Sequence, residues 1–186
     1  GNISSPQQLN WRSDQTPPTV VFNNTPAAIT ADTTPNFTFT GTDLGSGVAS
    51  YECRVDQAAS YTSCSNNLTL SGLVDGPHQL SVRAIDNVGR ISQTISYSWT
   101  QDSAAPTIQF TQTPRALENS IQVTFGFSGI NASQGIVSYQ CRLDSGSYQT
   151  CSSPQSLSGL SDGNHIFSVI GQDAAGNNSS PISFSR

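Results

Sequence analysis

Four cysteines carry the clearest covalent chemistry in this chain. Cys53 and Cys64 are separated by a short segment, and Cys141 and Cys151 are separated by almost the same number of residues. Zinc sites usually use Cys-x-x-Cys pairs or added histidines, so the wider spacing found here favours disulfides over a metal site. Disulfides persist in oxidising compartments, and the cysteines therefore predict a protein that works outside the cytoplasm.

Two histidines stand at matching places in an Asp-Gly-x-His motif, as His78 and His165. Histidine is a frequent catalytic base, and the segment Gly159-Leu160-Ser161-Asp162-Gly163 matches the nucleophile elbow of serine hydrolases. The first copy of the motif has Val74 in place of the serine, and the elbow needs a strand-to-helix turn that the flanking pattern does not offer. We predict no catalysis and a structural role, in which each ring hydrogen-bonds back to its own loop.

Five aspartates near the loops and junctions are the candidate metal ligands, because Ca²⁺ takes clustered carboxylate and carbonyl oxygens. They are Asp14, Asp43, Asp86, Asp102 and Asp173, and they form no dense sequence motif. Asp86 and Asp173 each end a predicted strand, where a simpler role is to cap the following turn through the side chain. The sequence leaves a Ca²⁺ site between domains and turn capping both open, and it indicates no other cofactor.

The residues above recur because the chain contains one module twice. Tyr51-Glu52-Cys53-Arg54-Val55-Asp56 returns as Tyr139-Gln140-Cys141-Arg142-Leu143-Asp144, and the flanking residues keep the same register. A module of about 85 residues is long enough to own a hydrophobic core, so we predict two domains, at residues 17–101 and 102–186.

The repeat also decides the disulfide pairing. Each copy contains one pair of cysteines at nearly the same spacing, so each is expected to close its own bond, Cys53–Cys64 and Cys141–Cys151. The short segment between the partners predicts a hairpin whose strands lie close enough for bridging.

Residues 1–16 match the end of the module, and we read them as the last strand of a preceding, truncated repeat with its linker. Leu9 and Trp11 would then lack their own sheet, so we expect them to contact the end of the first domain or a neighbouring sheet edge. The proline-containing joints at 11–19 and 99–107 favour extended backbone and predict semi-rigid connections.

Composition narrows the classes of partner. The 186 residues include 7 arginines, no lysine and 12 acidic residues, for a net charge of −5. Phosphate backbones need clustered cations, so a nucleic-acid partner is not expected. No apolar stretch is long enough to cross a bilayer, which predicts no membrane insertion in this fragment.

Apolar residues alternate with polar ones in short runs separated by turn residues, which is typical of strands. We therefore predict an all-β fold of two tandem Ig-like β-sandwich domains with about seven strands each, and a barrel is the less favoured alternative. The residues expected to face the core are Val20, Phe22, Phe37, Phe39, Tyr51, Cys53, Val55, Leu80, Val82, Ala84, Ile95, Tyr97 and Trp99.

These motifs resemble bacterial immunoglobulin-like tandem repeats of large surface or secreted adhesin-type proteins. The resemblance rests on Tyr-Glu-Cys-Arg-Val-Asp, Ser-Gly-Leu-x-Asp-Gly-x-His, Ser-Val-Arg-Ala-x-Asp and Gly176-Asn177, and it covers nearly the whole chain. It implies a non-catalytic stalk or fibre on a bacterial cell surface, whose neighbours are further Ig-like repeats. The chain departs from the pattern at Arg186, which stands where the first copy has Trp99.

Two alternatives stay open, a ligand-binding adhesin module and an accessory module of a secreted enzyme. A binding module would take a glycan or protein on a host or prey cell surface through the loops, with Asp43, Tyr61, Asn131 and Tyr148 as candidates. The tyrosine rings would suit sugar stacking, but they recur in both copies, which favours a role in covering the disulfide or core.

Overall fold

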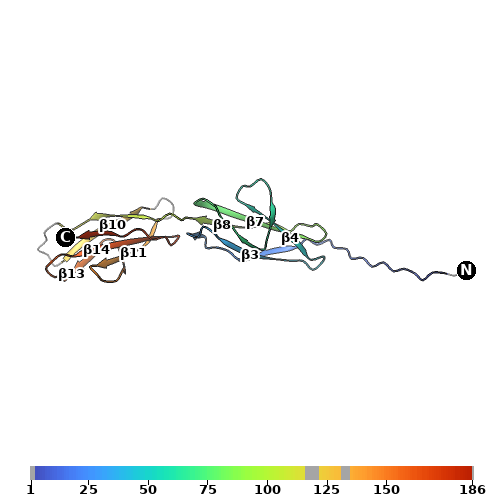
Figure 1. The fold of residues 1–186 in the computed structure, drawn as a ribbon, viewed down its shortest axis with the longest axis horizontal. Helices are drawn as coiled ribbons and strands as arrows, with labels where there is room; N and C mark the ends of the chain where they lie inside the picture. Colours follow the sequence, from blue (N-terminus) through green and yellow to red (C-terminus); the bar gives the residue numbers. More distant parts are fainter. Residues whose placement is uncertain (1–2, 116–121, 131–134, 186) are drawn as a thin grey trace. The chain divides into compact units, whose positions relative to one another are not determined.

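The computed structural model describes residues 3–115, 122–130 and 135–185, and within these ranges the chain forms strands and no helix (Figure 1). The strands build four sheets, which pair into two β-sandwiches. The predicted all-β class and the two tandem sandwiches are therefore confirmed. The described residues contain no helix long and apolar enough to cross a membrane.

The first sandwich packs a three-stranded sheet, in the order β1-β3-β6, against a five-stranded sheet, in the order β2-β8-β7-β4-β5. The pairs β1–β3, β3–β6, β4–β5 and β4–β7 are antiparallel, whereas β2 runs parallel to β8. The strands are β1 (Thr19–Asn24), β2 (Ile29–Thr30), β3 (Asn36–Thr42), β4 (Val48–Val55), β5 (Thr62–Cys64), β6 (Asn67–Thr69), β7 (Gly76–Asp86) and β8 (Ile95–Gln101).

The second sandwich repeats this plan with sheets in the orders β13-β10-β9 and β12-β11-β14-β15. The residues that correspond to β2 in the repeat, 117 and 118, lie outside the described ranges. The strands are β9 (Thr107–Gln112), β10 (Gln122–Ile130), β11 (Ile136–Leu143), β12 (Gln149–Cys151), β13 (Gln155–Ser158), β14 (Ile166–Asp173) and β15 (Ile182–Ser185).

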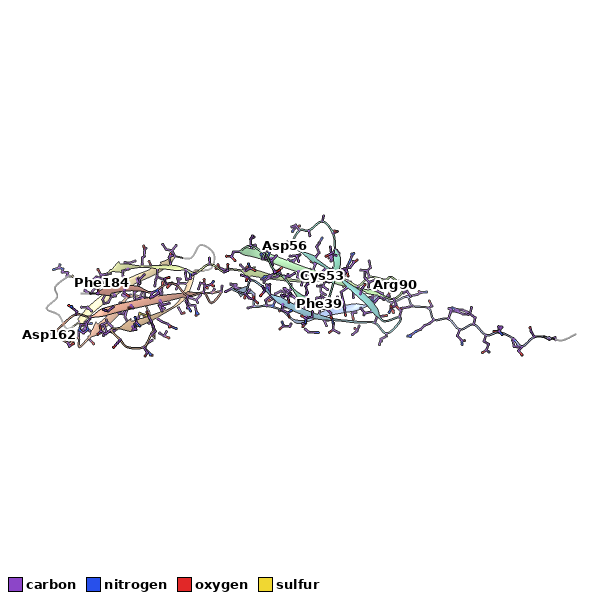
Figure 2. All side chains as sticks on the ribbon, in the orientation of Figure 1. Phe39, Cys53, Asp56, Arg90, Asp162 and Phe184 are labelled. Atoms are coloured by element: carbon purple, nitrogen blue, oxygen red, sulfur yellow. A yellow bond between two sulfur atoms is a disulfide. The ribbon has the colours of Figure 1, made fainter. Side chains whose placement is uncertain are left out.

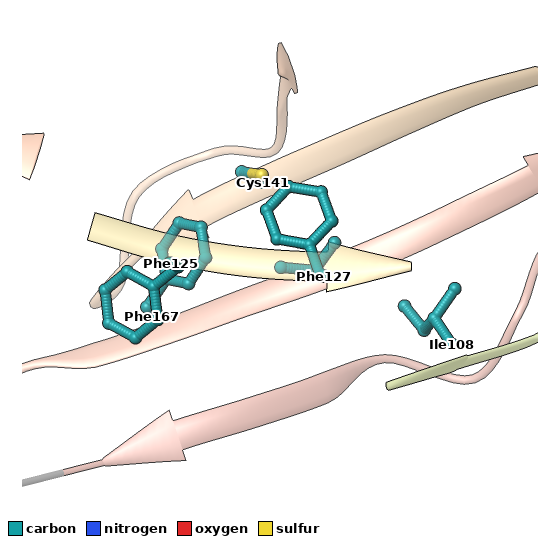
Figure 3. Packing of buried hydrophobic residues seen from close by; sticks show 6 residues of the cluster. Ile108, Phe125, Phe127, Cys141 and Phe167 are labelled. Atoms are coloured by element: carbon teal, nitrogen blue, oxygen red, sulfur yellow. The ribbon is translucent and has the colours of Figure 1, made fainter. Parts of the chain in front are cut away.

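Each sandwich has its own core, made by the alternate residues that the sequence pattern placed inside. In the first, Phe37 and Phe39 of β3 face Leu80 and Val82 of β7, and all four are almost fully buried. In the second, the Phe125 and Phe167 rings stack with centroids 4.3 Å apart (Figure 3). Because successive side chains in a strand point to opposite faces, this alternation leaves polar residues outside.

The segment before the first sandwich differs from its prediction. Residues 3–18 form no strand, and Leu9 and Trp11 are both 83% exposed. The segment does contact the end of the first sandwich, where Arg12 donates from its guanidinium to the carbonyl of Leu44. Arg12, rather than the predicted Leu9 and Trp11, therefore makes this contact.

The observed strands lie inside the predicted ranges 17–101 and 102–186, and the autonomy of these ranges as folding units stays a prediction. Strand β6 has only three residues and was not among the strands that the sequence pattern indicated. Its pairing with β3 is reinforced by Asn36, whose side-chain amide donates to Asn67 and Thr69. A three-residue edge strand is too short to show the alternation that identifies a strand.

Candidate functional site

The disulfides pair as predicted, Cys53 with Cys64 and Cys141 with Cys151, and each has a Cα–Cα separation of 5.8 Å. Each bond links two neighbouring antiparallel strands of one sheet, β4 to β5 and β11 to β12. It fastens a three-residue edge strand to the sheet, which leaves a short and covalently held edge. The bonds indicate an extracytoplasmic, oxidising compartment.

The two candidate sugar-stacking tyrosines lie beside these hairpins, with their faces in contact with arginines. The guanidinium carbons of Arg54 and Arg83 lie 5.0 and 4.2 Å from the centroid of the Tyr61 ring, and that of Arg142 lies 4.7 Å from the Tyr148 centroid. A cation–π contact of this kind occupies a ring face on which a sugar would otherwise stack. The ring positions therefore favour the covering role over ligand stacking.

Both histidines bind back to the loop that precedes them, as their sequence positions predicted. The Nε2 atom of His78 lies 2.7 Å from the carbonyl oxygen of Val74, and that of His165 lies 3.0 Å from the carbonyl oxygen of Ser161. His78 is buried, and its ring centroid lies 5.4 Å from that of Trp99. These contacts use each ring to hold a corner of a sandwich.

The match to the hydrolase elbow has no structural counterpart. Ser161 contributes its main-chain carbonyl to His165, and the segment leads from β13 to β14 without a helix. The neighbouring Asp162 lies on this loop (Figure 2). A nucleophile elbow requires a strand-to-helix turn and a base that accepts the serine hydroxyl proton. The geometry therefore offers no activated serine here.

Three of the predicted metal-ligating aspartates converge at one end of the first sandwich. Asp14 precedes β1, Asp43 lies in the loop between β3 and β4, and Asp86 ends β7. One carboxylate oxygen from each lies within 4.8 Å of those of the other two. Asp102 and Asp173 belong to no such group among the described residues. We call Asp14, Asp43 and Asp86 the aspartate cluster.

Main-chain amides of the surrounding loops support the aspartate cluster. Asp14 accepts from the amides of Thr16 and Ser46, at 3.0 and 2.5 Å, and its carboxylate packs against Gly45, where no side chain stands in the way. Asp43 accepts from the amide of Gly47 at 2.6 Å. Hydrogen bonds from Ser46 and then Thr16 hold the pKa of Asp14 well below its usual range, so this group is ionised at neutral pH.

Asp86 is the most buried member of the cluster, with 2% of its surface exposed. Its Oδ1 atom accepts from the amides of Val88 and Arg90, at 2.9 and 2.8 Å, which is the turn-capping role that the sequence suggested. Its Oδ2 atom is also buried but has no hydrogen-bond partner. A buried carboxylate oxygen without a partner is costly, because it has lost its water without gaining a donor.

The equivalent aspartate of the second sandwich, Asp173, is fully partnered. Its Oδ1 accepts from the Asn177 amide at 2.8 Å, and its Oδ2 accepts from the Asn177 side chain at 3.0 Å. That side chain also donates to the carbonyl of Asp102, at 2.7 Å. Asn131, the counterpart of Asp43, lies outside the described residues, so its prediction as a binding-loop residue stays open.

Sequence reasoning missed the residue that distinguishes the two copies. The position of Asn177 is occupied in the first sandwich by Arg90, which is labelled in Figure 2. Its Nε donates to the Asp14 carbonyl at 3.1 Å. The signal was present, because the two residues follow the matching glycines Gly89 and Gly176. The effect of this difference depends on which oxygen atom the Arg90 or Asn177 side chain reaches, and a comparison of the two sequences does not show which atom that is.

The pairing of Asp144 with His165 was also missed, with the Nδ1 atom of His165 2.8 Å from a carboxylate oxygen of Asp144. This contact raises the pKa of His165. Hydrogen bonds from the Ile166 amide and then His165 lower the pKa of Asp144. Asp144 has a left-handed φ of 52°, and its other carboxylate oxygen accepts from Ile166. Aspartate tolerates this conformation because its short side chain bonds locally.

The chain is similar in structure to several tandem modules. The fibronectin(III)-like modules of Clostridium thermocellum CbhA share 18% identity over 90% of this chain and 92% of that one, with a TM-score of 0.49. A two-domain fibronectin type III segment of chicken tenascin shares 15% identity over 90% and 97%, with a TM-score of 0.36. The D00-D0 domain of intimin shares 12% identity over 90% and 98%, with a TM-score of 0.40. No protein-family model and no curated protein matches this sequence.

Proposed function

We propose that this chain is a non-catalytic spacer segment of an extracellular protein, forming part of a stalk or fibre on a bacterial cell surface. Two sandwiches of one plan follow each other in the chain, and each has its own core and its own disulfide. Such modules add length without needing a shared core, and their partners are neighbouring sandwiches of the same kind.

The observation that carries this proposal is the use of reactive side chains for local structure in both copies. The chain has two histidines and four cysteines, and all of them hold loops or hairpins. An arginine guanidinium lies over the ring of each of Tyr61 and Tyr148. A catalytic or sugar-binding module would instead present such groups toward an open site.

The path of the chain through the second sandwich also suits a spacer. Asp102, which precedes β9, is held by Asn177 just beyond the last residue of β14. The final strand, β15, ends beside the first residue of β14, where Ser185 pairs with Ile166. The chain therefore enters and leaves at opposite ends of β14, an eight-residue strand of about 26 Å. Tension on the chain would act along the strands.

Single-molecule stretching of the full chain tests this proposal. We expect two unfolding steps of similar length, since the two sandwiches have similar strands and cores. The disulfides join residues 11 and 10 positions apart, so reduction should lengthen each step by roughly 3.5 nm at about 0.35 nm per residue. A single cooperative step for both sandwiches would contradict independent modules.

A glycan array and an esterase assay test the two rival classes. We expect no specific glycan signal and no hydrolysis. Glycan binding that disappears in Tyr61→Ala and Tyr148→Ala would overturn the spacer in favour of a binding module. Ester cleavage that disappears in Ser161→Ala would show that the purely structural role given to Ser161 and His165 is wrong.

A further inference from the structure

We propose that the first sandwich binds one Ca²⁺ ion between Asp14, Asp43 and Asp86, and that the equivalent place in the second sandwich binds none. The ion would join the segment before β1 to the β3–β4 loop and to the end of β7. This inference does not depend on the spacer function, because it concerns the ligands at one end of a single sandwich.

The geometry of the aspartate cluster suits the coordination sphere of calcium. Ca²⁺ binds oxygen ligands at 2.3–2.6 Å, so two oxygens on opposite sides of the ion lie up to about 5 Å apart. One carboxylate oxygen from each aspartate lies within 4.8 Å of those of the other two, which is within this span. The site offers carboxylates and no histidine or thiolate, and that donor set favours Ca²⁺ or Mg²⁺ over zinc.

The orphaned oxygen of Asp86 is an independent sign that a ligand belongs there. Asp86 is 2% exposed, and its Oδ2 atom has no hydrogen-bond donor, although two amides serve Oδ1. The described ion pairs join Arg83 to Glu52 and His165 to Asp144, so neither compensates the cluster. A bound cation would supply the missing partner and offset the repulsion among three carboxylates.

Two arginines lie close to the cluster, but both donate to main-chain carbonyls. Arg12 bonds the carbonyl of Leu44 and Arg90 that of Asp14. Their positive charges weaken cation binding without replacing it, so we expect a dissociation constant of about 0.1–1 mM, in the range of extracellular calcium modules. At millimolar free Ca²⁺ such a site would be substantially filled.

The second sandwich differs from this arrangement at two positions. The sequence places Asn131 where the first copy has Asp43, which removes one charge. Asn177 stands where the first copy has Arg90, and its amide occupies Oδ2 of Asp173, the atom that is free of donors in Asp86. An internal amide therefore does in one copy what we propose a metal ion does in the other.

Amide NMR of the full chain, titrated with Ca²⁺ to about 10 mM after chelation, tests the proposal. We expect saturable shifts of the amides that donate to the cluster, those of Ser46, Gly47, Val88 and Arg90, and no shift of the Asn177 amide. Mg²⁺ should bind at least tenfold more weakly, because it demands a tighter octahedral shell. Absence of saturable shifts, equal affinity for Mg²⁺, or parallel shifts in both sandwiches would overturn the site.

Matched variants separate the site from general charge effects. Asp86→Asn should weaken Ca²⁺ binding at least tenfold, whereas Asp173→Asn, its counterpart in the second sandwich, should leave binding unchanged. Unchanged affinity in Asp86→Asn would overturn the proposal. If that variant does not fold, Asp43→Asn gives the same test, because the second copy carries asparagine there.

Arg90→Asn provides the sharpest comparison. It removes a positive charge beside the cluster, so simple electrostatics predicts tighter Ca²⁺ binding. We expect weaker binding instead, by roughly tenfold, because the introduced amide should occupy Oδ2 of Asp86 as Asn177 does for Asp173. Tighter binding in this variant would show that the orphaned oxygen is not the ligand.

Discussion

Removal of either disulfide should destabilise its own sandwich by a similar amount. The bonds close loops between residues 11 and 10 positions apart, and the chain-entropy relation gives about 2.7 kcal/mol for each. A small domain has a net stability of only about 5–10 kcal/mol, so this loss is a large share. For a domain of this size it corresponds to a fall in Tm of roughly 10–20 °C.

Calorimetry of the full chain measures both effects, because each sandwich should give its own transition. The double variants Cys53→Ala/Cys64→Ala and Cys141→Ala/Cys151→Ala remove one bond each. Reduction of the unaltered chain is the control, since it opens both bonds and keeps the sulfur atoms of the buried Cys53 and Cys141 in place. The alanine variants should lose slightly more, because those two sites also lose packing.

Two results would refute this reasoning. A loss below about 1 kcal/mol would mean that the bridged hairpin keeps residual structure in the unfolded chain, so that the disulfide removes little additional entropy. A loss that differs by more than about 1 kcal/mol between the copies would mean that local packing, rather than loop closure, sets the contribution.

The second sandwich should be most stable between the ordinary pKa values of aspartate, 3.8, and histidine, 6.5. The pKa of His165 is raised by folding, so its contribution to stability is complete below pH 6.5 and is lost as pH rises through the pKa of the folded state. The pKa of Asp144 is lowered by folding, so its contribution is complete above pH 3.8 and is lost as pH falls below that value. Tm measured against pH should show both flanks, and His165→Gln should flatten the alkaline one. His78→Ala should cost the first sandwich about 1–3 kcal/mol in urea unfolding, because it removes a buried ring that packs on Trp99 and its hydrogen bond to the Val74 carbonyl. An unchanged unfolding midpoint would contradict the structural role of His78. Gly129→Ala should destabilise the second sandwich by about 1–3 kcal/mol, because the added methyl group would overlap the side chain of Ile136. An unchanged stability in the same assay would show that Ile136 in β11 can move to make room for the methyl group.

Much of the fold was predictable because its determinants are local or repeated. Alternation of apolar residues located β3 and β7 from Phe37, Phe39, Leu80 and Val82, since the period of two follows from strand geometry alone. The short strands β2 and β6 were missed, because two or three residues cannot display a period.

The candidate site was predictable in composition and not in arrangement. The sequence named five aspartates, and the structure groups three of them. Asp14, Asp43 and Asp86 come from a linker, a loop and a strand end, so their meeting depends on sheet register and on the path of the chain before β1. Neither of these is a local property.

The repeated sequence by itself determined the disulfide pairing. Each copy contains one pair of cysteines at nearly the same spacing, so the pairing that gives both copies the same bond is Cys53–Cys64 and Cys141–Cys151. The tertiary structure alone decided that Asp86 and Asp173, identical in residue type and position in the repeat, differ in their surroundings. One has a buried oxygen without a donor, and the other has the amide of Asn177. The physical reason is that a hydrogen bond forms only when donor and acceptor meet at the right distance and angle, and residue identity does not specify this geometry.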